Sequence, residues 1–214
     1  MEKKTIYILG AGGFGRELLW WIKDINTIKP TWKIGGFLDD NLHALDGIQC
    51  DVPVAGSIKD WQPKENEVFA LAFGSPVLKR KIVAEMKAKG GKFATIIHPT
   101  AMVSEFAHYG EGLIMFPNSK LSVNSTVGNF VSILSTPIGH ETTIGDYSVI
   151  SGNCNIIRNV IIGKDVFLAA GVSIAQDVHV GDGAYLGLGC VVLKDVKAGA
   201  KMFGNPARAM VMQK

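Results

Sequence analysis

His140 and Glu141 are the adjacent residues of this chain best suited to proton transfer. An unperturbed imidazole has a pKa of ~6.5, so at neutral pH it can accept a proton from an attacking hydroxyl or amine. A carboxylate within reach fixes the imidazole tautomer and stabilises the imidazolium. The alternative is a solvated surface histidine without a chemical role. Four further histidines lack an adjacent acid and are interpreted as structural or solvated: His43, His98, His108 and His179.

A six-residue repeat fills much of the second half of the chain and decides where these side chains point. Stepping by six from Ile138 meets an aliphatic residue every time as far as Val192. The residues two positions earlier are small or β-branched, and this column includes Cys154 and Cys190. A period of six fits neither an α-helix nor one long strand. It predicts a parallel β-helix of short strands and turns, with three flat faces and about 18 residues per coil.

The repeat is looser upstream, where it passes through Leu121, Val127 and Ile133. The phase then slips by one residue before Ile138, which predicts a kink or small loop near 135–137. Glycine and Asp or Asn in the turns tolerate positive φ. Since the two cysteines of the repeat fall in an inward column, we interpret them as buried filler and not as catalytic thiols.

The register of the repeat also predicts which residues face outward. Residues two positions after the inward aliphatics project from the coil, so His140 is not expected in the core. At 18 residues per coil, two sets of outward residues stack along two different edges. One stack contains His140, Arg158 and Gln176, and the other contains Gly152, Ala170 and Leu188.

Residues 1–95 alternate strands and helices in the manner of a small parallel α/β sheet. We expect strands at residues 5–10, 33–38, 68–73 and 93–97, and helices at 16–25 and 76–89. A GxGxxG motif closes the first strand, and acids close the second. Such glycines let a ligand approach a helix N-terminus, and an acid can bind sugar hydroxyls. The candidate ligand-binding residues are Gly12, Gly13, Phe14, Asp39, Asp40 and Gly74.

The length of this region argues against a dinucleotide dehydrogenase, which needs two such halves. We therefore predict a single mononucleotide-binding half and give little weight to a NAD-dependent oxidoreductase. The alternative for the glycine motif is a tight turn without a ligand.

Composition excludes several other classes. The net charge is +3 and no block of Lys and Arg stands out, which disfavours nucleic-acid binding. No apolar stretch approaches the ~20 residues of a membrane span. Three cysteines without a CxxC pair, and histidines without metal-ligand spacing, indicate neither a disulfide framework nor a metal site. We expect a cytoplasmic protein without a membrane span.

The motifs GAGGFGRE, FLDD, IIHPTA, IGHETTIGD and FGNPAR, together with the hexapeptides, resemble the bacterial PglD/NeuD-type sugar O/N-acetyltransferases. The resemblance covers nearly the whole chain. It implies a Rossmann-like nucleotide-sugar-binding half domain at 1–95 and a left-handed β-helix acetyltransferase domain at 96–214. It further implies acetyl-CoA as co-substrate, bound in a groove between the subunits of a homotrimer.

The resemblance also implies roles for individual residues. His140 is expected to be the general base and Glu141 to orient it, while Ala170 and Leu188 lie along the CoA arm. Relatives often carry His where this chain has Phe14 and Val149, and Gly where it has Arg158. The backbone N–H at position 158 can meet the thioester carbonyl, so positions 149 and 158 are expected on the cofactor side. The arginine adds bulk and charge that either reshape the acyl pocket or meet an anionic acceptor.

The resulting hypothesis is acetyl transfer from acetyl-CoA to an amine of a nucleotide-linked amino sugar, for surface glycan biosynthesis. Two alternatives stay open at this point. One is O-acetylation of a free sugar or sialic acid with the same base and cofactor. The other is a non-catalytic scaffold that binds a nucleotide sugar.

Overall fold

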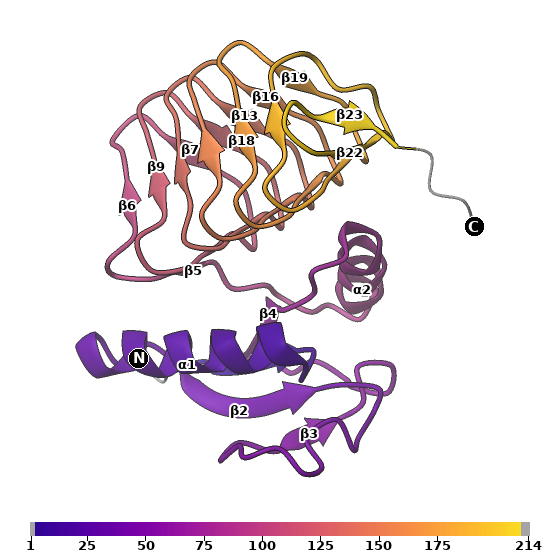
Figure 1. Ribbon diagram of the computed structural model, residues 1–214. Coiled ribbons are helices and arrows are strands. Elements are labelled where there is room, and N and C mark those ends of the chain that lie inside the picture. The colour runs from indigo at the N-terminus through magenta and orange to yellow at the C-terminus, as the bar shows by residue number, and fades with distance from the viewer. Residues whose placement is uncertain (1–2, 211–214) are drawn as a thin grey trace. The chain divides into compact units, whose positions relative to one another are not determined.

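The computed structural model describes residues 3–210 and divides into two compact units between Ile96 and Ile97. The first unit is a small α/β structure, and the second is a parallel β-helix (Figure 1). This confirms the predicted fold class, an α/β region followed by a β-helix of hexapeptide repeats.

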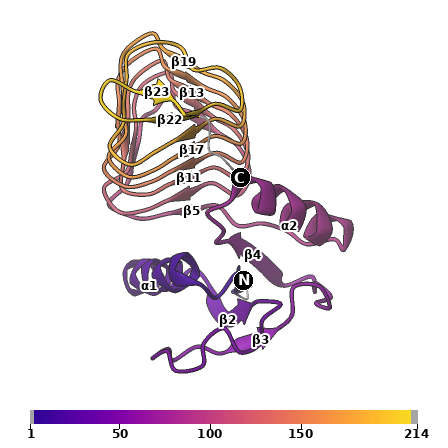
Figure 2. The ribbon, with the colours of Figure 1, turned by 45° about the vertical axis from the view of Figure 1, so that its right-hand side comes forward.

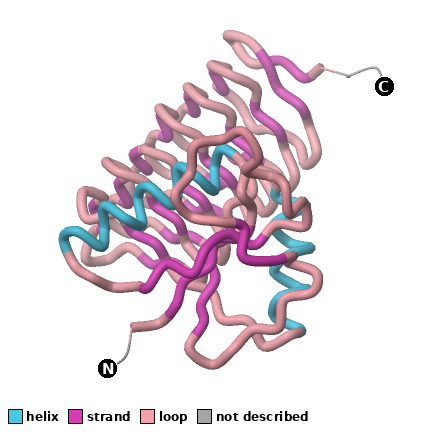
Figure 3. The backbone as a smooth tube through the Cα atoms, turned by 90° about the horizontal axis from the view of Figure 1, so that it is seen from below, coloured by secondary structure: helices cyan, strands magenta, loops and turns pink. Residues whose placement is uncertain are grey.

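The α/β unit contains one four-stranded parallel sheet with the order β3-β2-β1-β4. The same unit contains two helices, drawn in cyan in Figure 3. Apolar residues of the first helix, including Leu18 and Ile22, are fully buried, as an amphipathic helix over a sheet requires. The elements are β1 Thr5–Leu9, α1 Gly13–Ile28, β2 Lys33–Leu38, β3 Val54–Gly56, β4 Glu67–Leu71 and α2 Pro76–Ala88.

The structure of this unit differs from the expectations in three places. The strand expected at 93–97 does not extend the sheet: Phe93 makes only an isolated bridge to Phe69, and β5 (Ile96–Ile97) joins the β-helix. The three-residue strand β3 was not predicted, because its sequence is too short to show an alternating pattern. In addition, α1 begins at Gly13 instead of Arg16, which places its first turn inside the glycine motif.

The β-helix has three parallel faces, seen as three sides in the view of Figure 2. The eight-stranded sheet contains β5, β8 Ile114–Met115, β11 Ser132–Ile133, β14 Val149–Ile150, β17 Phe167–Leu168, β20 Tyr185–Leu186, β22 Lys201–Phe203 and β23 Arg208–Ala209. The six-stranded sheet contains β6 Met102–Val103, β9 Lys120–Leu121, β12 Pro137–Ile138, β15 Asn155–Ile156, β18 Ser173–Ile174 and β21 Val191–Val192. The five-stranded sheet contains β7 His108–Tyr109, β10 Thr126–Val127, β13 Thr143–Ile144, β16 Ile161–Ile162 and β19 His179–Val180.

The core of the β-helix consists of the two columns of the repeat. The large aliphatics, such as Ile150 and Leu168, have no exposed surface, and Cys154 and Cys190 are 1% and 0% exposed. Burial raises the pKa of both thiols, which disfavours the reactive thiolate. The cysteines therefore fill space between the coils, as their column predicts.

The slip in the repeat appears in the structure as one short corner. Strands β11 and β12 are separated by three residues instead of the usual four. Partner residues are consequently 17 apart across this coil, as in Thr126 and Thr143, but 18 apart in the next, as in Thr143 and Ile161. Ser135 turns this corner with a φ of 52°. The expected kink or loop is thus a tightened corner, and the sheets continue through it.

The far end of the β-helix is closed by β22 and β23, which pair antiparallel around Gly204, Asn205 and Pro206. These residues form the turn of a short hairpin. Over residues 3–210, none of the helices has the length and apolar character that a membrane crossing requires.

Candidate active site

His140 and Glu141 lie in the turn between β12 and β13, where the six-stranded sheet meets the five-stranded sheet. We call this edge of the β-helix the base corner; it also contains the turns 122–125, 157–160 and 175–178. The two side chains are 46% and 45% exposed, so the imidazole projects from the coil. Nδ1 of His140 hydrogen-bonds to Oε2 of Glu141. With Nδ1–H donated to the carboxylate, Nε2 is left to accept a proton from a substrate.

Glu141 is held in place from two sides. Its backbone occupies the left-handed region, with a φ of 52°, where the equivalent residues of neighbouring coils are Asn124 and Asn159. The Nδ2 amide of Asn124 donates to Oε1 of Glu141 at 3.4 Å. Hydrogen bonds from His140 first and then from Asn124, together with the charge of Arg158, lower the pKa of Glu141. The carboxylate therefore stays ionised in mild acid and can orient the imidazole.

Asn124 was missed by sequence reasoning. It lies 17 residues before Glu141, and counting by 18 through the shortened coil assigns it to the wrong column. The signal that could have identified it is the phase slip itself, counted through the turn at 134–136.

We expect Asn124→Gly to lower the turnover number about 3- to 10-fold, because one hydrogen bond that orients Glu141 is lost. Glycine accepts the positive φ of 56° without strain, so the backbone of the corner should not change. Steady-state kinetics should show an unchanged KM for both substrates. The matched control is Asn118→Gly, at a φ of 61° in a coil that contains neither the base nor the proposed CoA contacts, which should retain full activity. An Asn124→Gly enzyme with full turnover would remove this residue from the site.

Arg158 lies one coil beyond His140 in the base corner, as the register predicts. Its Nε donates to Oε1 of Gln176 at 3.2 Å, so the guanidinium extends along the β-helix toward the C-terminal coils. The flanking amides are used in the ladder: Ile157 N–H donates to Ile174 and Asn159 N–H to His140. Within residues 3–210, the Arg158 N–H donates a hydrogen bond to no acceptor. This N–H, one coil from the base, can therefore donate a hydrogen bond to an oxyanion and stabilise it.

Ala170 and Leu188 lie at a different edge, where the eight-stranded sheet meets the six-stranded sheet. We call this edge the second corner. Gly189 N–H donates to the Ala170 carbonyl at 3.0 Å, which places the two residues one coil apart. Leu188 is 75% exposed and leaves an apolar surface there. Val149, by contrast, lies on β14 of the eight-stranded sheet and is 1% exposed, so within one chain it does not join either corner.

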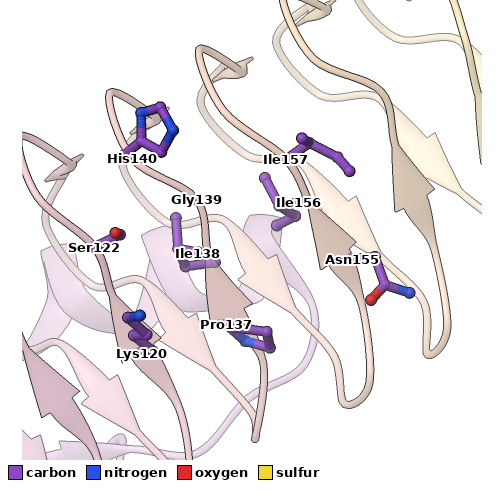
Figure 4. Close-up of a pocket in the computed structure, with 9 residues that line it drawn as sticks. All are labelled: Lys120, Ser122, Pro137, Ile138, Gly139, His140, Asn155, Ile156 and Ile157. Atoms are coloured by element: carbon purple, nitrogen blue, oxygen red, sulfur yellow. The ribbon is translucent and has the colours of Figure 1, made fainter.

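A groove of about 240 Å³ crosses the six-stranded sheet and ends at His140. Figure 4 shows the imidazole at one margin and Lys120, Pro137 and Asn155 at the other. The remaining lining residues are Ser122, Ile138, Gly139, Ile156 and Ile157. The base thus faces a surface depression in which a substrate can lie.

His43 also meets a carboxylate, contrary to the expectation from neighbouring residues, through a 3.0 Å contact with Asp46. Both side chains are more than 70% exposed, and this pair lies in the α/β unit, outside the groove. His98 is buried, and its Nδ1 lies 2.9 Å from the Thr100 hydroxyl, which supports a structural role.

The four glycines of the GAGGFG sequence meet different structural requirements. Gly10 has a φ of 99° in the tight turn, and a Cβ on Gly15 would lie 1.9 Å from the Gly10 carbonyl oxygen. Gly12 and Gly13 have no neighbouring atom within 4 Å of a Cβ position. Packing therefore requires Gly10 and Gly15 but leaves an open approach at 12 and 13, where α1 begins. An open helix N-terminus lets a ligand approach the backbone N–H groups.

Asp39 and Asp40 reach the same edge of the sheet, with different partners. Asp39 accepts the Ala11 N–H at 2.8 Å and the Asn41 N–H at 2.9 Å, so it anchors the glycine loop. Asp40 accepts from the Lys59 N–H at 3.0 Å and the Ser57 hydroxyl at 2.8 Å. These contacts, led by the Lys59 backbone, lower the pKa of Asp40.

Two further residues complete this edge. Gly74 follows β4, beside β1 in the sheet, and a Cβ there would meet nothing within 4 Å. Arg16, which the sequence had not singled out, donates to the Ala11 carbonyl at 3.3 Å and so lies beside the loop. The α/β unit thus gathers the predicted glycines and acids at the carboxyl edge of its sheet, where such folds bind ligands.

The comparisons with known proteins agree with both halves of this description. The family model described as PglD N-terminal domain matches residues 5–86. The model described as bacterial transferase hexapeptide (six repeats) matches residues 159–194. Both matches confirm the resemblance of the chain to the PglD/NeuD-type sugar acetyltransferases. The chain is an acyltransferase of the hexapeptide-repeat class, as its motifs predict.

Individual proteins are similar to this chain along nearly its whole length. The GDP-perosamine N-acetyltransferase of Escherichia coli O157:H7 is 29% identical over 215 residues, with 95% of each chain covered. The acetyltransferase domain of PglB from Neisseria gonorrhoeae, solved with acetyl coenzyme A, is 26% identical with a TM-score of 0.83, covering 98% of this chain and 100% of that one. WeeI from Acinetobacter baumannii AYE is 25% identical with a TM-score of 0.85, covering 96% and 99%.

Proposed function

We propose that this acetyltransferase transfers the acetyl group of acetyl-CoA to an amine of a nucleotide-linked amino sugar, in the biosynthesis of a surface glycan. The observation that carries the proposal is the exposed His140–Glu141 pair at the end of the groove. The names of the similar proteins, an N-acetyltransferase of GDP-perosamine and a domain solved with acetyl coenzyme A, support the substrates.

In the proposed reaction the sugar amine attacks the thioester carbonyl while Nε2 of His140 takes the amine proton. Glu141 stabilises the imidazolium, and the tetrahedral oxyanion is met by the free Arg158 N–H, a contribution of about 10²- to 10³-fold in comparable sites. Collapse of the intermediate breaks the carbon–sulfur bond, forms the amide and returns a proton to the CoA thiolate. The open positions at Gly12 and Gly13 support binding of the nucleoside part of the acceptor.

The two corners support a site shared between copies of the chain. The base and Arg158 lie at the base corner, whereas Ala170 and Leu188 lie at the second corner, across the width of the six-stranded sheet. We infer that the CoA arm contacts the base corner of one subunit and the second corner of another. Exposed apolar residues beside the base, Ile157 at 50% and Ile161 at 48%, fit a covered surface. We propose a homotrimer with the active sites between its subunits.

The proposal is tested by offering UDP-, GDP- and dTDP-linked amino sugars with acetyl-CoA and following release of the CoA thiol. At least one amino sugar should support release that depends on both substrates. Release with hydroxyl acceptors only would favour O-acetylation, and binding of a nucleotide sugar without any release would favour a scaffold.

A further inference from the structure

The groove that ends at His140 contains one permanent charge, the ammonium group of Lys120. Lys120 and His140 are among its nine lining residues, and none of the nine carries a carboxylate. The Lys120 side chain is exposed, and its ammonium group has no hydrogen bond or ion pair within residues 3–210. An unpaired ammonium in a groove without acids favours an anionic ligand over a neutral one.

The local sequence explains why the groove lies at this place. Proline has no backbone N–H, so Pro137 cannot extend the ladder toward β15. The pairing of β12 with β15 is consequently reduced to Ile138 and Ile156, while β12 and β9 keep the pair Pro137–Lys120. Asn155, on the far side of Pro137, donates to the Ser173 hydroxyl at 3.3 Å and leaves the depression open. The groove is therefore built into the coils around the base.

The separation between Lys120 and His140 limits the size and shape of the ligand. Lys120 pairs with Pro137, which precedes His140 by three residues, a span of roughly 10 Å along an extended chain. A sugar ring whose amine faces His140 places its anomeric phosphates on the other side of the ring. An acceptor with an amine at one end and a diphosphate at the other matches the groove, whereas a free neutral sugar leaves Lys120 unused.

We propose that Lys120 is a substrate-binding residue that holds the diphosphate of the acceptor while the sugar amine lies at His140. Ser122, which lies in the groove on the same coil, supplies a hydroxyl to the sugar or to a phosphate oxygen. This inference rests on the proposed function, since it assigns one end of the same groove to the acceptor. It makes the anionic group of the acceptor, and not only its amine, a requirement for efficient transfer.

The test compares the wild type with Lys120→Met, which removes the charge and keeps the length of the side chain. For a nucleotide-linked amino sugar, kcat/KM should fall about 10- to 100-fold, chiefly through the acceptor KM, because a charge-assisted hydrogen bond is lost. The KM for acetyl-CoA should not change. The slow reaction of the same amino sugar as its methyl glycoside, which has no phosphate, should also be unchanged. Lys120→Arg should recover most of the activity.

Lys201→Met is the matched control, because Lys201 is an exposed lysine at the first position of a strand on the eight-stranded sheet. It should retain wild-type kinetics. Equal losses of Lys120→Met on both acceptors, or a raised KM for acetyl-CoA, would overturn the proposal and leave acetyl transfer itself intact. If the wild type transferred no acetyl group to any amine, the proposed function would fail instead.

A binding measurement keeps the inference testable without catalysis. Ile156 and Ile157 line the groove, so their labelled methyl groups can report on it by NMR while inorganic pyrophosphate is added. The methyl signals should shift in the wild type and in Lys201→Met but not in Lys120→Met. Signals that do not move in the wild type, or that move equally in Lys120→Met, would contradict an anion site at this lysine.

Discussion

Replacing His140 with alanine is expected to lower the turnover number at least about 100-fold, within the range of 10²–10⁴ that general base catalysis typically supplies. The imidazole is the group that removes the amine proton, and a carboxylate such as that of Glu141 is a weaker base, since an unperturbed Glu has a pKa of about 4.3. The affinity for acetyl-CoA should remain nearly unchanged, since the proposed CoA contacts at Ala170 and Leu188 lie at the second corner and do not involve the imidazole. Steady-state kinetics and calorimetric titration with CoA measure the two effects.

The variant should fold normally, because the His140 side chain is 46% exposed and its removal leaves no buried cavity. His179→Ala is the control: this histidine lies on β19 in the five-stranded sheet, and its backbone N–H, which the substitution retains, donates to Asp195. It should retain full activity. A His140→Ala enzyme that transfers acetyl groups at the wild-type rate would exclude the proposed base.

Gly139→Ala should have the second largest effect, because position 139 has no room for a side chain. A Cβ there would lie 2.1 Å from the Ile157 carbonyl oxygen and 2.5 Å from its carbon. The coil that contains His140 must then move away from the coil that contains Arg158. We expect a loss of about 1–3 kcal/mol in the free energy of unfolding. We also expect about a 100-fold loss in turnover, since displacement of a catalytic group by ~1 Å can cost that much.

Chemical denaturation measures the first loss and initial rates the second. Gly152→Ala is the matched stability control, since a Cβ there would approach only the Leu134 carbonyl oxygen, at an ordinary 3.4 Å. Its unfolding midpoint should match that of the wild type. A Gly139→Ala enzyme with wild-type stability would show that the two coils separate freely at this point, which would contradict the close packing described for the base corner.

The repeat allowed much of the β-helix to be predicted, because burial imposes the same requirement on every coil. Aliphatic residues such as Ile150 and Leu168 must fill the interior, so their spacing reports the coil directly. The same count predicted that His140 projects from the surface and that Ala170 and Leu188 lie one coil apart. These positions follow from backbone periodicity and need no knowledge of side-chain contacts.

Other features depend on interactions that the repeat does not encode. The hydrogen bond from Asn124 to Glu141 crosses the one coil with 17 residues, where counting fails. The groove around Lys120 follows from a missing N–H at Pro137, a local defect in the ladder. In the α/β unit, Asp39 was expected to bind a ligand, but both of its oxygens also accept local backbone N–H groups. Only tertiary contacts reveal such roles.

The central claim, acetyl transfer to an amine, is tested most directly by the products formed from isotopically labelled acetyl-CoA and a panel of UDP-, GDP- and dTDP-linked amino sugars. Mass spectrometry before and after mild alkali distinguishes an amide, which is stable, from an ester, which is cleaved. We predict a singly labelled nucleotide sugar that keeps its label after alkali, and no such product with the His140→Ala enzyme. A label that alkali removes, or an unlabelled sugar at every enzyme concentration with each nucleotide-linked amine offered, would contradict the proposed function.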